Sequence, residues 1–175
     1  MSKLGPLLIH DLEAFSKEEL SRRAEKYGFS QPQILELFAW DYELAAQLQA
    51  LSEDFVLKGG AAAQLYLPTE IQRGSVDIDL ITQLTNDELN HLLSMLSKKF
   101  RGFAPLFQFK RYLPKAPKPN VPINTYYVLL PSVFQEDCSI KVDILTSHLS
   151  LPTMERSDIE TFAIKVSKVK VVSLG

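Results

Sequence analysis

The most informative part of this sequence begins with Phe55-Val56-Leu57-Lys58-Gly59-Gly60-Ala61-Ala62-Ala63 and continues with Arg73-Gly74-Ser75-Val76-Asp77-Ile78-Asp79-Leu80. The first stretch predicts a short apolar strand that stops at two glycines, followed by a short helix that the alanines favour. The second stretch predicts a strand over 76–81, in which carboxylates alternate with aliphatic residues. Because alternate residues of a strand share a face, Asp77 and Asp79 are expected on one face and the aliphatic residues on the buried one.

Further helices and strands are predicted on both sides of this segment. A capping box that begins at Ser16 and a glycine at position 28 delimit one helix, and a second capping box begins at Thr85. The expected helices cover 16–28, 30–51 and 85–96, and the expected strands cover 106–113, 123–130, 139–145 and, as one or two strands, 162–174. This order predicts an α+β protein with a mixed β-sheet flanked by helices.

Two parts are predicted along the chain. An N-terminal helical segment, 1–52, is expected to pack on a core that comprises 53–175. The last predicted strand runs to the end of the sequence, so we expect a core truncated at its C-terminus, as in the N-terminal part of a longer protein.

The composition excludes several classes of protein. Of the 175 residues, 46% are hydrophobic and 23% are charged, which excludes a disordered or low-complexity chain. No apolar run reaches the ~18 residues that a membrane helix needs, and no signal peptide is evident. A single cysteine, Cys138, excludes an internal disulfide framework and a multi-cysteine zinc site. These features predict a cytoplasmic protein.

The net charge of −2 conceals a strongly basic stretch. No acidic residue lies between Glu88 and Glu136, whereas seven basic residues do: Lys98, Lys99, Arg101, Lys110, Arg111, Lys115 and Lys118. Such a segment suggests a partner that carries phosphates, and the alternative is a solvated positive face. Tyr112, Tyr126 and Tyr127 nearby could stack bases of an RNA, but packing within the strands is the interpretation that we favour for them.

Carboxylates on two predicted strands point to metal chemistry. Asp77 and Asp79 repel each other unless a cation bridges them, and their hard oxygen ligands suit Mg²⁺ or Mn²⁺. Asp143 lies on the strand 139–145 and shares a face with Lys141. If the two strands are neighbours, the three carboxylates converge on a two-metal site. The alternative is that Asp77 and Asp79 only meet water and that Asp143 pairs with a lysine.

The residues between the two strands add phosphate-binding features. Gly59 and Gly60 permit a close backbone approach at a helix start, where free N–H groups attract phosphates, or they simply form a tight turn. Arg73 could clamp a triphosphate or hold the strand end by pairing with an aspartate. Ser75 could donate to a phosphate oxygen or cap its loop.

This arrangement resembles the nucleotidyltransferases of the DNA polymerase β-like superfamily, and more closely those of the AbiEii/AbiGii toxin type. The family pattern has a lysine and two glycines followed by Thr or Ser, then Arg-x-Ser-x-Asp-Ile-Asp-Leu. The resemblance covers roughly 30–145 and is sharp over 55–81 and 139–145. It implies that the nucleotide is bound by Lys58, Gly59, Gly60, Arg73 and Ser75, and that the metals are bound and catalysis is performed by Asp77, Asp79 and Asp143.

The resemblance also implies an activity. It implies metal-dependent transfer of a nucleotidyl group from an NTP to an RNA, including tRNA, or to a protein, by the toxin of a toxin–antitoxin or phage-defence system with an antitoxin partner. The chain departs from the pattern at Ala61, which replaces the Thr or Ser. The alternative is therefore a degenerate, non-catalytic module that binds nucleotide or RNA. A plain interaction domain would instead require Asp143 to lie far from the strand of Asp77.

Overall fold

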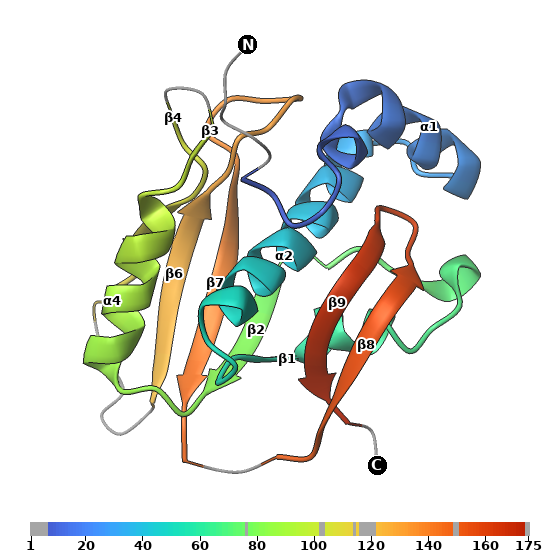
Figure 1. Cartoon of the computed structure of the whole chain (residues 1–175). Coiled ribbons are helices and arrows are strands. Elements are labelled where there is room, and N and C mark those ends of the chain that lie inside the picture. Colours follow the sequence, from blue (N-terminus) through green and yellow to red (C-terminus); the bar gives the residue numbers. More distant parts are fainter. Residues whose placement is uncertain are drawn as a thin grey trace.

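A seven-stranded mixed sheet forms the centre of the molecule, in the order β5-β6-β7-β2-β1-β9-β8 (Figure 1). This computed structural model describes residues 7–75, 77–101, 104–113, 115, 122–148 and 151–173. The helices are α1 (Lys17–Tyr27), α2 (Pro32–Leu51), α3 (Gly59–Gln64) and α4 (Asn86–Ser97), and the strands are β1 (Val56–Lys58), β2 (Asp77–Thr82), β3 (Phe100–Arg101), β4 (Ala104–Pro105), β5 (Gln108–Arg111), β6 (Ile123–Leu129), β7 (Ser139–Thr146), β8 (Thr153–Glu160) and β9 (Lys165–Val172). The predicted α+β class with a mixed sheet is confirmed.

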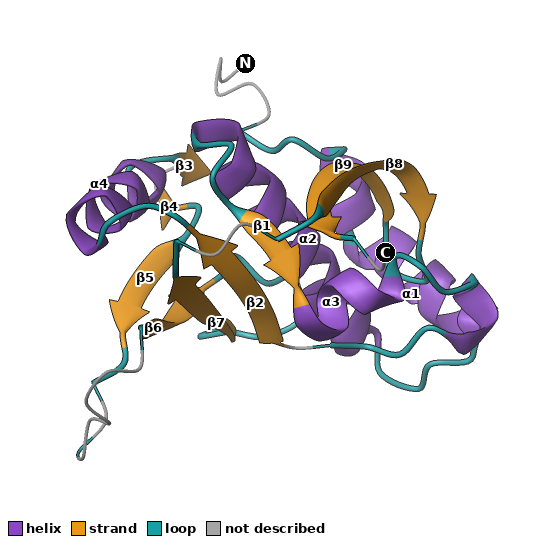
Figure 2. Cartoon of the chain, turned by 90° about the horizontal axis from the view of Figure 1, so that it is seen from below, coloured by secondary structure: helices purple, strands orange, loops and turns teal. Residues whose placement is uncertain are grey.

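The pairing of the strands places the distant parts of the sequence side by side. Strand β2 runs parallel to β7 and antiparallel to β1, which in turn runs parallel to β9. The hairpins β5–β6 and β8–β9 form the two edges, and β6 joins the first hairpin to β7. Helices α2 and α4 lie on one side of the sheet (Figure 2), and no helix of the described residues covers the other face of β5, β6, β7 and β2.

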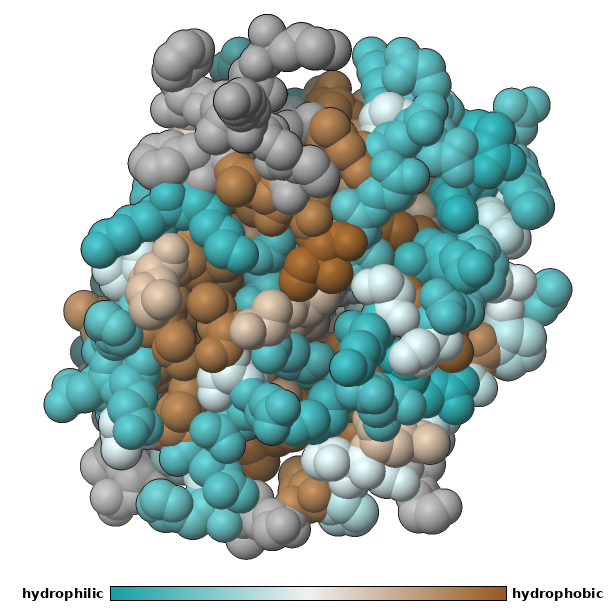
Figure 3. All heavy atoms as spheres, viewed as in Figure 1, coloured by the Kyte–Doolittle hydropathy of each residue, from teal (hydrophilic) through white to brown (hydrophobic). Residues whose placement is uncertain are grey.

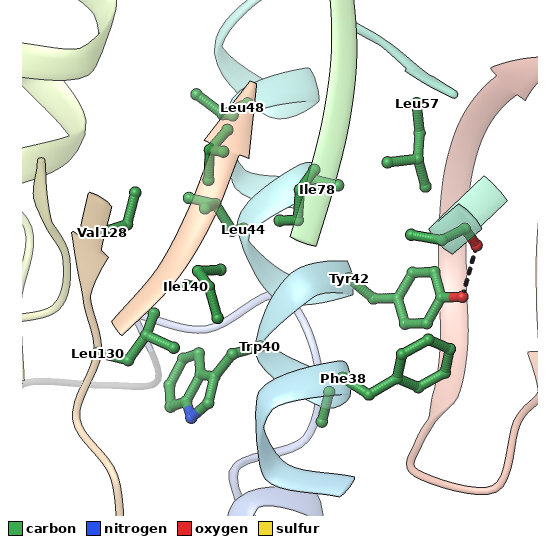
Figure 4. Close-up of a cluster of buried hydrophobic side chains, with 14 of the residues drawn as sticks. Phe38, Trp40, Tyr42, Leu44, Leu48, Leu57, Ile78, Val128, Leu130 and Ile140 are labelled. Carbon is green, nitrogen blue, oxygen red and sulfur yellow. Dashed lines mark hydrogen bonds between the residues drawn. The ribbon is translucent and has the colours of Figure 1, made fainter. Parts of the chain in front are cut away.

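Helix α2 supplies the largest buried side chains of the core. Phe38, Trp40 and Tyr42 are fully buried; Trp40 points to the side of Ile140, whereas Phe38 points away from it and stacks on Phe162 (Figure 4). The Tyr42 hydroxyl donates a hydrogen bond to the Ala61 carbonyl, at 2.7 Å, which ties α2 to the first turn of α3. The hydrophobic cluster therefore runs across position 52, where the sequence places the end of the helical segment. The two-part division stays a prediction.

The local signals at the helix ends are found where the sequence places them. Ser16 accepts a hydrogen bond from the N–H of Glu19, and Gly28 ends α1 in the left-handed conformation, with φ 76°. The capping box predicted at Ser16 is only half formed, because the Ser16 N–H donates to the Glu13 carbonyl and the Glu19 carboxylate pairs with Arg22 and Arg23. At α4, Thr85 and Glu88 form the reciprocal capping box. These contacts satisfy N–H groups that the first turn of a helix cannot pair internally.

Some elements differ from the expectation. Strand β8 was not predicted, because it is an exposed edge strand whose charged residues follow no apolar alternation. Leu106 and Phe107 are buried ahead of β5 instead of lying within it. Helix α3 begins at Gly59, two residues earlier than its alanines suggest. Val76 and most of the proline-rich stretch 114–122, which includes Lys118, lie outside the described residues.

The face seen in Figure 1 mixes hydrophobic and hydrophilic surface. Hydrophobic residues are visible in the middle of this face, around α2 and α4, with hydrophilic residues around them (Figure 3). Within the described part of the chain, no helix combines the length and the apolar character needed to cross a bilayer.

Candidate active site on the open face of the sheet

The three predicted aspartates lie on two neighbouring strands. The register of the parallel pair β2–β7 sets Asp79 opposite Asp143 and Asp77 opposite Lys141. On the other side of β2, Lys58 of β1 is the partner of Asp79. The intervening Ile78 and Leu80 are fully buried on the side of α2, so the aspartates face away from α2 and lie beside the start of α3. We call this side of β5, β6, β7, β2 and β1 the carboxylate face.

Asp143 is held by two neighbours. The Thr125 hydroxyl of β6 donates a hydrogen bond to Asp143 Oδ1, and Lys141 Nζ lies 3.3 Å from Asp143 Oδ2. The negative charge of Asp143 raises the pKa of Lys141. Asp143 thus pairs with a lysine, as the alternative predicted, and it is also the strand partner of Asp79, whereas a two-metal site stays a prediction. Thr125 was missed, although its place between two buried residues of β6 put it on the exposed face.

Like charges meet at Asp79. Burial raises the pKa of the Asp79 carboxyl, the charges of Asp143 and Asp77 raise it further, and Lys58 opposes the shift. A divalent cation would relieve this repulsion, and carboxylate oxygens are the ligands that Mg²⁺ and Mn²⁺ prefer. Lys141, whose Nζ lies 3.3 Å from Asp143 Oδ2, occupies a place where such an ion would bind Asp143. Within the described ranges, no three His, Cys, Asp or Glu side chains lie close enough together as they stand to hold a metal.

The two glycines have different surroundings. Gly59 has φ +71°, and a Cβ atom there would lie 2.5 Å from Asp79 Oδ2. A side chain at this position would therefore be strained by the backbone and would also displace the carboxylate. A Cβ on Gly60 would meet only the side chain of Ser75, with Oγ at the ordinary distance of 3.4 Å. The tight turn predicted as an alternative is present at Gly59, and a phosphate contact stays a prediction for both glycines.

Helix α3 starts directly behind the carboxylates. Lys58 precedes it as the N-terminal cap residue, and no side chain caps the helix within the described contacts. Its first backbone N–H groups consequently remain available to an anion. Ala61 is buried, and its carbonyl accepts the hydrogen bond from Tyr42. The position that departs from the family pattern is therefore part of the packing of α2 against α3.

Ser75 and Arg73 lie on the loop that leads into β2. The Ser75 hydroxyl donates a hydrogen bond to the Asp77 carbonyl, at 3.0 Å, and Ser75 adjoins Gly60. The Arg73 N–H donates to Gln64 Oε1 of α3, while its side chain is exposed. None of the described contacts joins the Arg73 guanidinium to the aspartates, so the structure brings Ser75 to the site and leaves Arg73 at its margin.

A buried acid lies behind the site and was not singled out from the sequence. Of the three acids buried on α2, Glu36 accepts hydrogen bonds from Ser132 and Val133, and Glu43 accepts them from Ile9 and His10. Both carboxyl oxygens of Asp41 lack a partner among the described residues. Burial raises the pKa of Asp41 well above its ordinary value, and the charge of Asp77 adds to the shift.

The raised pKa of Asp41 predicts a pH-dependent stability. A group with a raised native pKa contributes its full stability below its unfolded pKa and loses it as the pH rises towards the native value. We expect the free energy of unfolding of the wild type to fall, relative to Asp41→Asn, by up to about 1.4 kcal/mol per pH unit above about pH 4. Urea unfolding of both proteins between pH 5 and 8 measures this difference. Parallel curves would contradict a raised pKa at Asp41.

Comparisons with known proteins address the family and the fold. The family model described as "Nucleotidyl transferase AbiEii toxin, Type IV TA system" matches residues 43–175. A comparison with curated protein sequences found no significant match. The solved structure of MenT4, a nucleotidyltransferase toxin from Mycobacterium tuberculosis H37Rv, is similar in fold, with a TM-score of 0.57, 15% identity and coverage of 89% of this chain. This chain spans 55% of the length of the MenT4 chain. A cytoplasmic RNA terminal U-transferase gives a TM-score of 0.38 at 17% identity, with 74% of this chain and 36% of the other covered.

Proposed function

Because the chain belongs to the AbiEii family of nucleotidyl transferase toxins, we propose that its carboxylate face transfers a nucleotidyl group from an NTP to an acceptor hydroxyl. The observation that carries this proposal is the register of β2 and β7, which sets Asp79 opposite Asp143, with Lys58 and Gly59 beside them. A family of nucleotidyltransferases requires such a cluster, because the reaction brings together a triphosphate, a divalent cation and a hydroxyl group.

The three aspartates would hold Mg²⁺ or Mn²⁺. When bound, these ions neutralise the triphosphate and stabilise the charge that develops on the attacking and leaving oxygens. By holding these ions, the aspartates would also orient the triphosphate of the nucleotide. Lys141 and Lys58, which flank the aspartates in the register, would balance their negative charge in the absence of substrate.

The residues around the start of α3 would bind the triphosphate. No side chain caps the start of α3 among the described contacts, so the N–H groups of Gly59 and Gly60 would donate to a phosphate. Lys58 would add a positive charge beside them. Ser75 supports the loop through its bond to the Asp77 carbonyl. Arg73, exposed on the same loop, would reach the outer phosphates.

Asp143 would handle the proton of the acceptor. The acceptor oxygen forms a bond to the α-phosphorus, the bond from that phosphorus to the bridging oxygen of the pyrophosphate breaks, and pyrophosphate leaves. The proton of the acceptor hydroxyl passes to Asp143 and from there to solvent. The Thr125 hydroxyl orients Asp143 Oδ1, and Asp143 Oδ2, which pairs with Lys141 at 3.3 Å in the absence of substrate, would accept the proton.

The acceptor and the setting complete the proposal. We place the acceptor among RNAs, including tRNA, with a protein hydroxyl as the alternative, and the reaction in the cytoplasm, where NTPs are abundant. The family name describes a type IV toxin–antitoxin system, so an antitoxin is the expected protein partner. This chain spans 55% of the length of MenT4, so we also propose, and do not take from MenT4, the activity of the whole protein.

Two observations favour a second candidate, a non-catalytic nucleotide- or RNA-binding module. Ala61 removes the hydroxyl of the family pattern, and Asp143 is engaged by Lys141 and Thr125. Such a module would bind NTP through the start of α3 without transferring any part of it.

A labelling experiment separates these functions. The protein is incubated with each α-³²P-labelled NTP, with Mg²⁺ or Mn²⁺, and with total RNA or with protein alone, beside calorimetric titration of the same NTP. Metal-dependent label in RNA or protein, absent with Asp77→Asn, supports transfer. Binding of NTP without label supports the non-catalytic module. No binding under any condition would reject both functions.

A further inference from the structure

Two exposed tyrosines lie on the carboxylate face beside the candidate active site. Tyr112 is 49% exposed and Tyr127 is 41% exposed. Their ring centroids lie 5.9 Å apart, and the ring planes are nearly perpendicular, at 85°. Tyr126 differs, since it is only 4% exposed and its hydroxyl points to Asn90 of α4. All three tyrosines pack as expected, but only Tyr126 does so in the core, whereas Tyr112 and Tyr127 pack against each other on the exposed face.

The strand register relates these rings to the aspartates. Thr125 is the partner of Asp143, and the Tyr112 N–H donates to the Thr125 carbonyl at 2.8 Å. One row of residues thus runs across the sheet through Lys58, Asp79, Asp143, Thr125 and Tyr112. The next row runs through Asp77, Lys141, Tyr127 and Lys110.

These rows set the distance between the rings and Asp143. Tyr127 is the diagonal neighbour of Asp143 across β6 and β7, and diagonal neighbours in an antiparallel pair lie about 7–8 Å apart. The span from a ribose 3′-oxygen to the base of the same nucleotide is comparable. A nucleotide whose 3′-hydroxyl lies at Asp143 would consequently have its base over the tyrosines.

The charge around the rings matches a polyanion. Lys110 is exposed opposite Tyr127, and Lys141 lies on the other side of the same ring. The acid-free stretch between Glu88 and Glu136 includes both tyrosines. Aromatic rings interleaved with lysines on an open sheet are typical of surfaces that bind single-stranded nucleic acid, because every base has a face that can stack.

Building on the proposed transfer reaction, we infer that Tyr112 and Tyr127 form a stacking platform for the 3′-terminal base of a single-stranded RNA acceptor. One ring presents its face to the base, and the perpendicular ring contacts the edge of the stacked pair. Lys110 binds the adjacent phosphate. The platform directs the terminal hydroxyl towards Asp143, so its ligand is defined by an accessible 3′ end rather than by sequence.

The test measures RNA binding without turnover. The probe is a fluorescein-labelled ten-nucleotide single-stranded RNA, titrated with protein in EDTA and without NTP, and followed by fluorescence anisotropy. We expect Tyr127→Ala and Tyr112→Ala each to raise the Kd about tenfold, and the Tyr→Phe variants to change it less than about twofold. Met154→Ala, an equally exposed apolar residue on β8, serves as the matched control and is expected to bind as the wild type.

A second RNA probe, which lacks the 3′-terminal base, tests whether that base is the one that stacks on the tyrosines. Removal of the 3′-terminal base from the probe should cost the wild type about tenfold in Kd and should cost Tyr127→Ala almost nothing, because the same stacking is already lost. Alanine variants that bind RNA as tightly as the wild type would overturn the platform. In that case another part of the protein, or a protein partner, covers the rings instead of RNA. An equal loss from the missing base in both proteins would overturn it too.

The outcome is separable from that of the proposed function. RNA binding with this pattern but without any nucleotide transfer would uphold the platform and reject the transfer reaction. Transfer that persists in Tyr127→Ala with an unchanged KM for RNA would reject the platform alone.

Discussion

Asp79→Asn is expected to lower the rate of nucleotidyl transfer by about 10³-fold or more while the protein unfolds at the same or a higher temperature. The loss follows because a metal ion on this carboxylate would supply several kcal/mol of transition-state stabilisation. The thermal result has a separate cause. Burial and the charges of Asp143 and Asp77 raise the pKa of Asp79, so its ionised form is unfavourable in the folded protein. The amide removes that charge.

The combination of lost activity and retained stability identifies a functional carboxylate. Rates are measured with a labelled NTP, and thermal unfolding is followed by circular dichroism in EDTA. Asp54→Asn is the matched control, because Asp54 is an exposed aspartate in the turn before β1 and its carboxylate forms hydrogen bonds only with Ser52 among the described residues. Transfer by Asp79→Asn at the wild-type rate would contradict the proposed site.

Gly59→Ala is expected to destabilise the protein by about 3 kcal/mol, to lower the Tm by roughly 10 °C, and to abolish transfer. A side chain at φ +71° costs about 1–2 kcal/mol in backbone strain, and its overlap with Asp79 Oδ2 adds a similar amount. The carboxylate must move to make room, so the site loses its geometry as well as its stability.

The adjacent Gly60→Ala is the internal control for this substitution. Gly60 is helical, and its Cβ would meet Ser75 Oγ at an ordinary distance, so the stability is expected to stay within about 1 kcal/mol of the wild type. Because phosphates are proposed to approach this backbone, the KM for NTP should rise in Gly60→Ala. Equal Tm values for Gly59→Ala and the wild type would show that the close approach to Asp79 is relieved at no cost.

Much of the candidate site was predictable because its signals are local. The alternation of aspartates and aliphatic residues places both carboxylates of β2 on one face, since a strand has a period of two residues. The glycine pair marks the junction of β1 and α3, where only a residue that tolerates a positive φ fits at Gly59. The Ser16 cap of α1 and the capping box of α4 are likewise read from four residues each. The motif order was sufficient to indicate the AbiEii family, which the family match confirms.

Other features were beyond the reach of local patterns. Strand β8 has no apolar alternation, because an edge strand with exposed faces buries too little to require one. Tyr126 is buried and Tyr112 and Tyr127 are exposed because helix α4 covers only one face of β6. Thr125 became part of the site only through its pairing with Asp143.

The amino-acid sequence alone therefore specified the class of the protein, the strand that bears Asp77 and Asp79, and the glycine turn beside it. The folded chain added the parallel pairing of β2 with β7, the bond from Thr125 to Asp143, and the isolation of Asp41 in the core. The physical reason is the range of the interactions. Propensity, capping and alternation act over a few neighbouring residues, whereas strand order and the burial of a charge result from the packing of the whole sheet against α2 and α4.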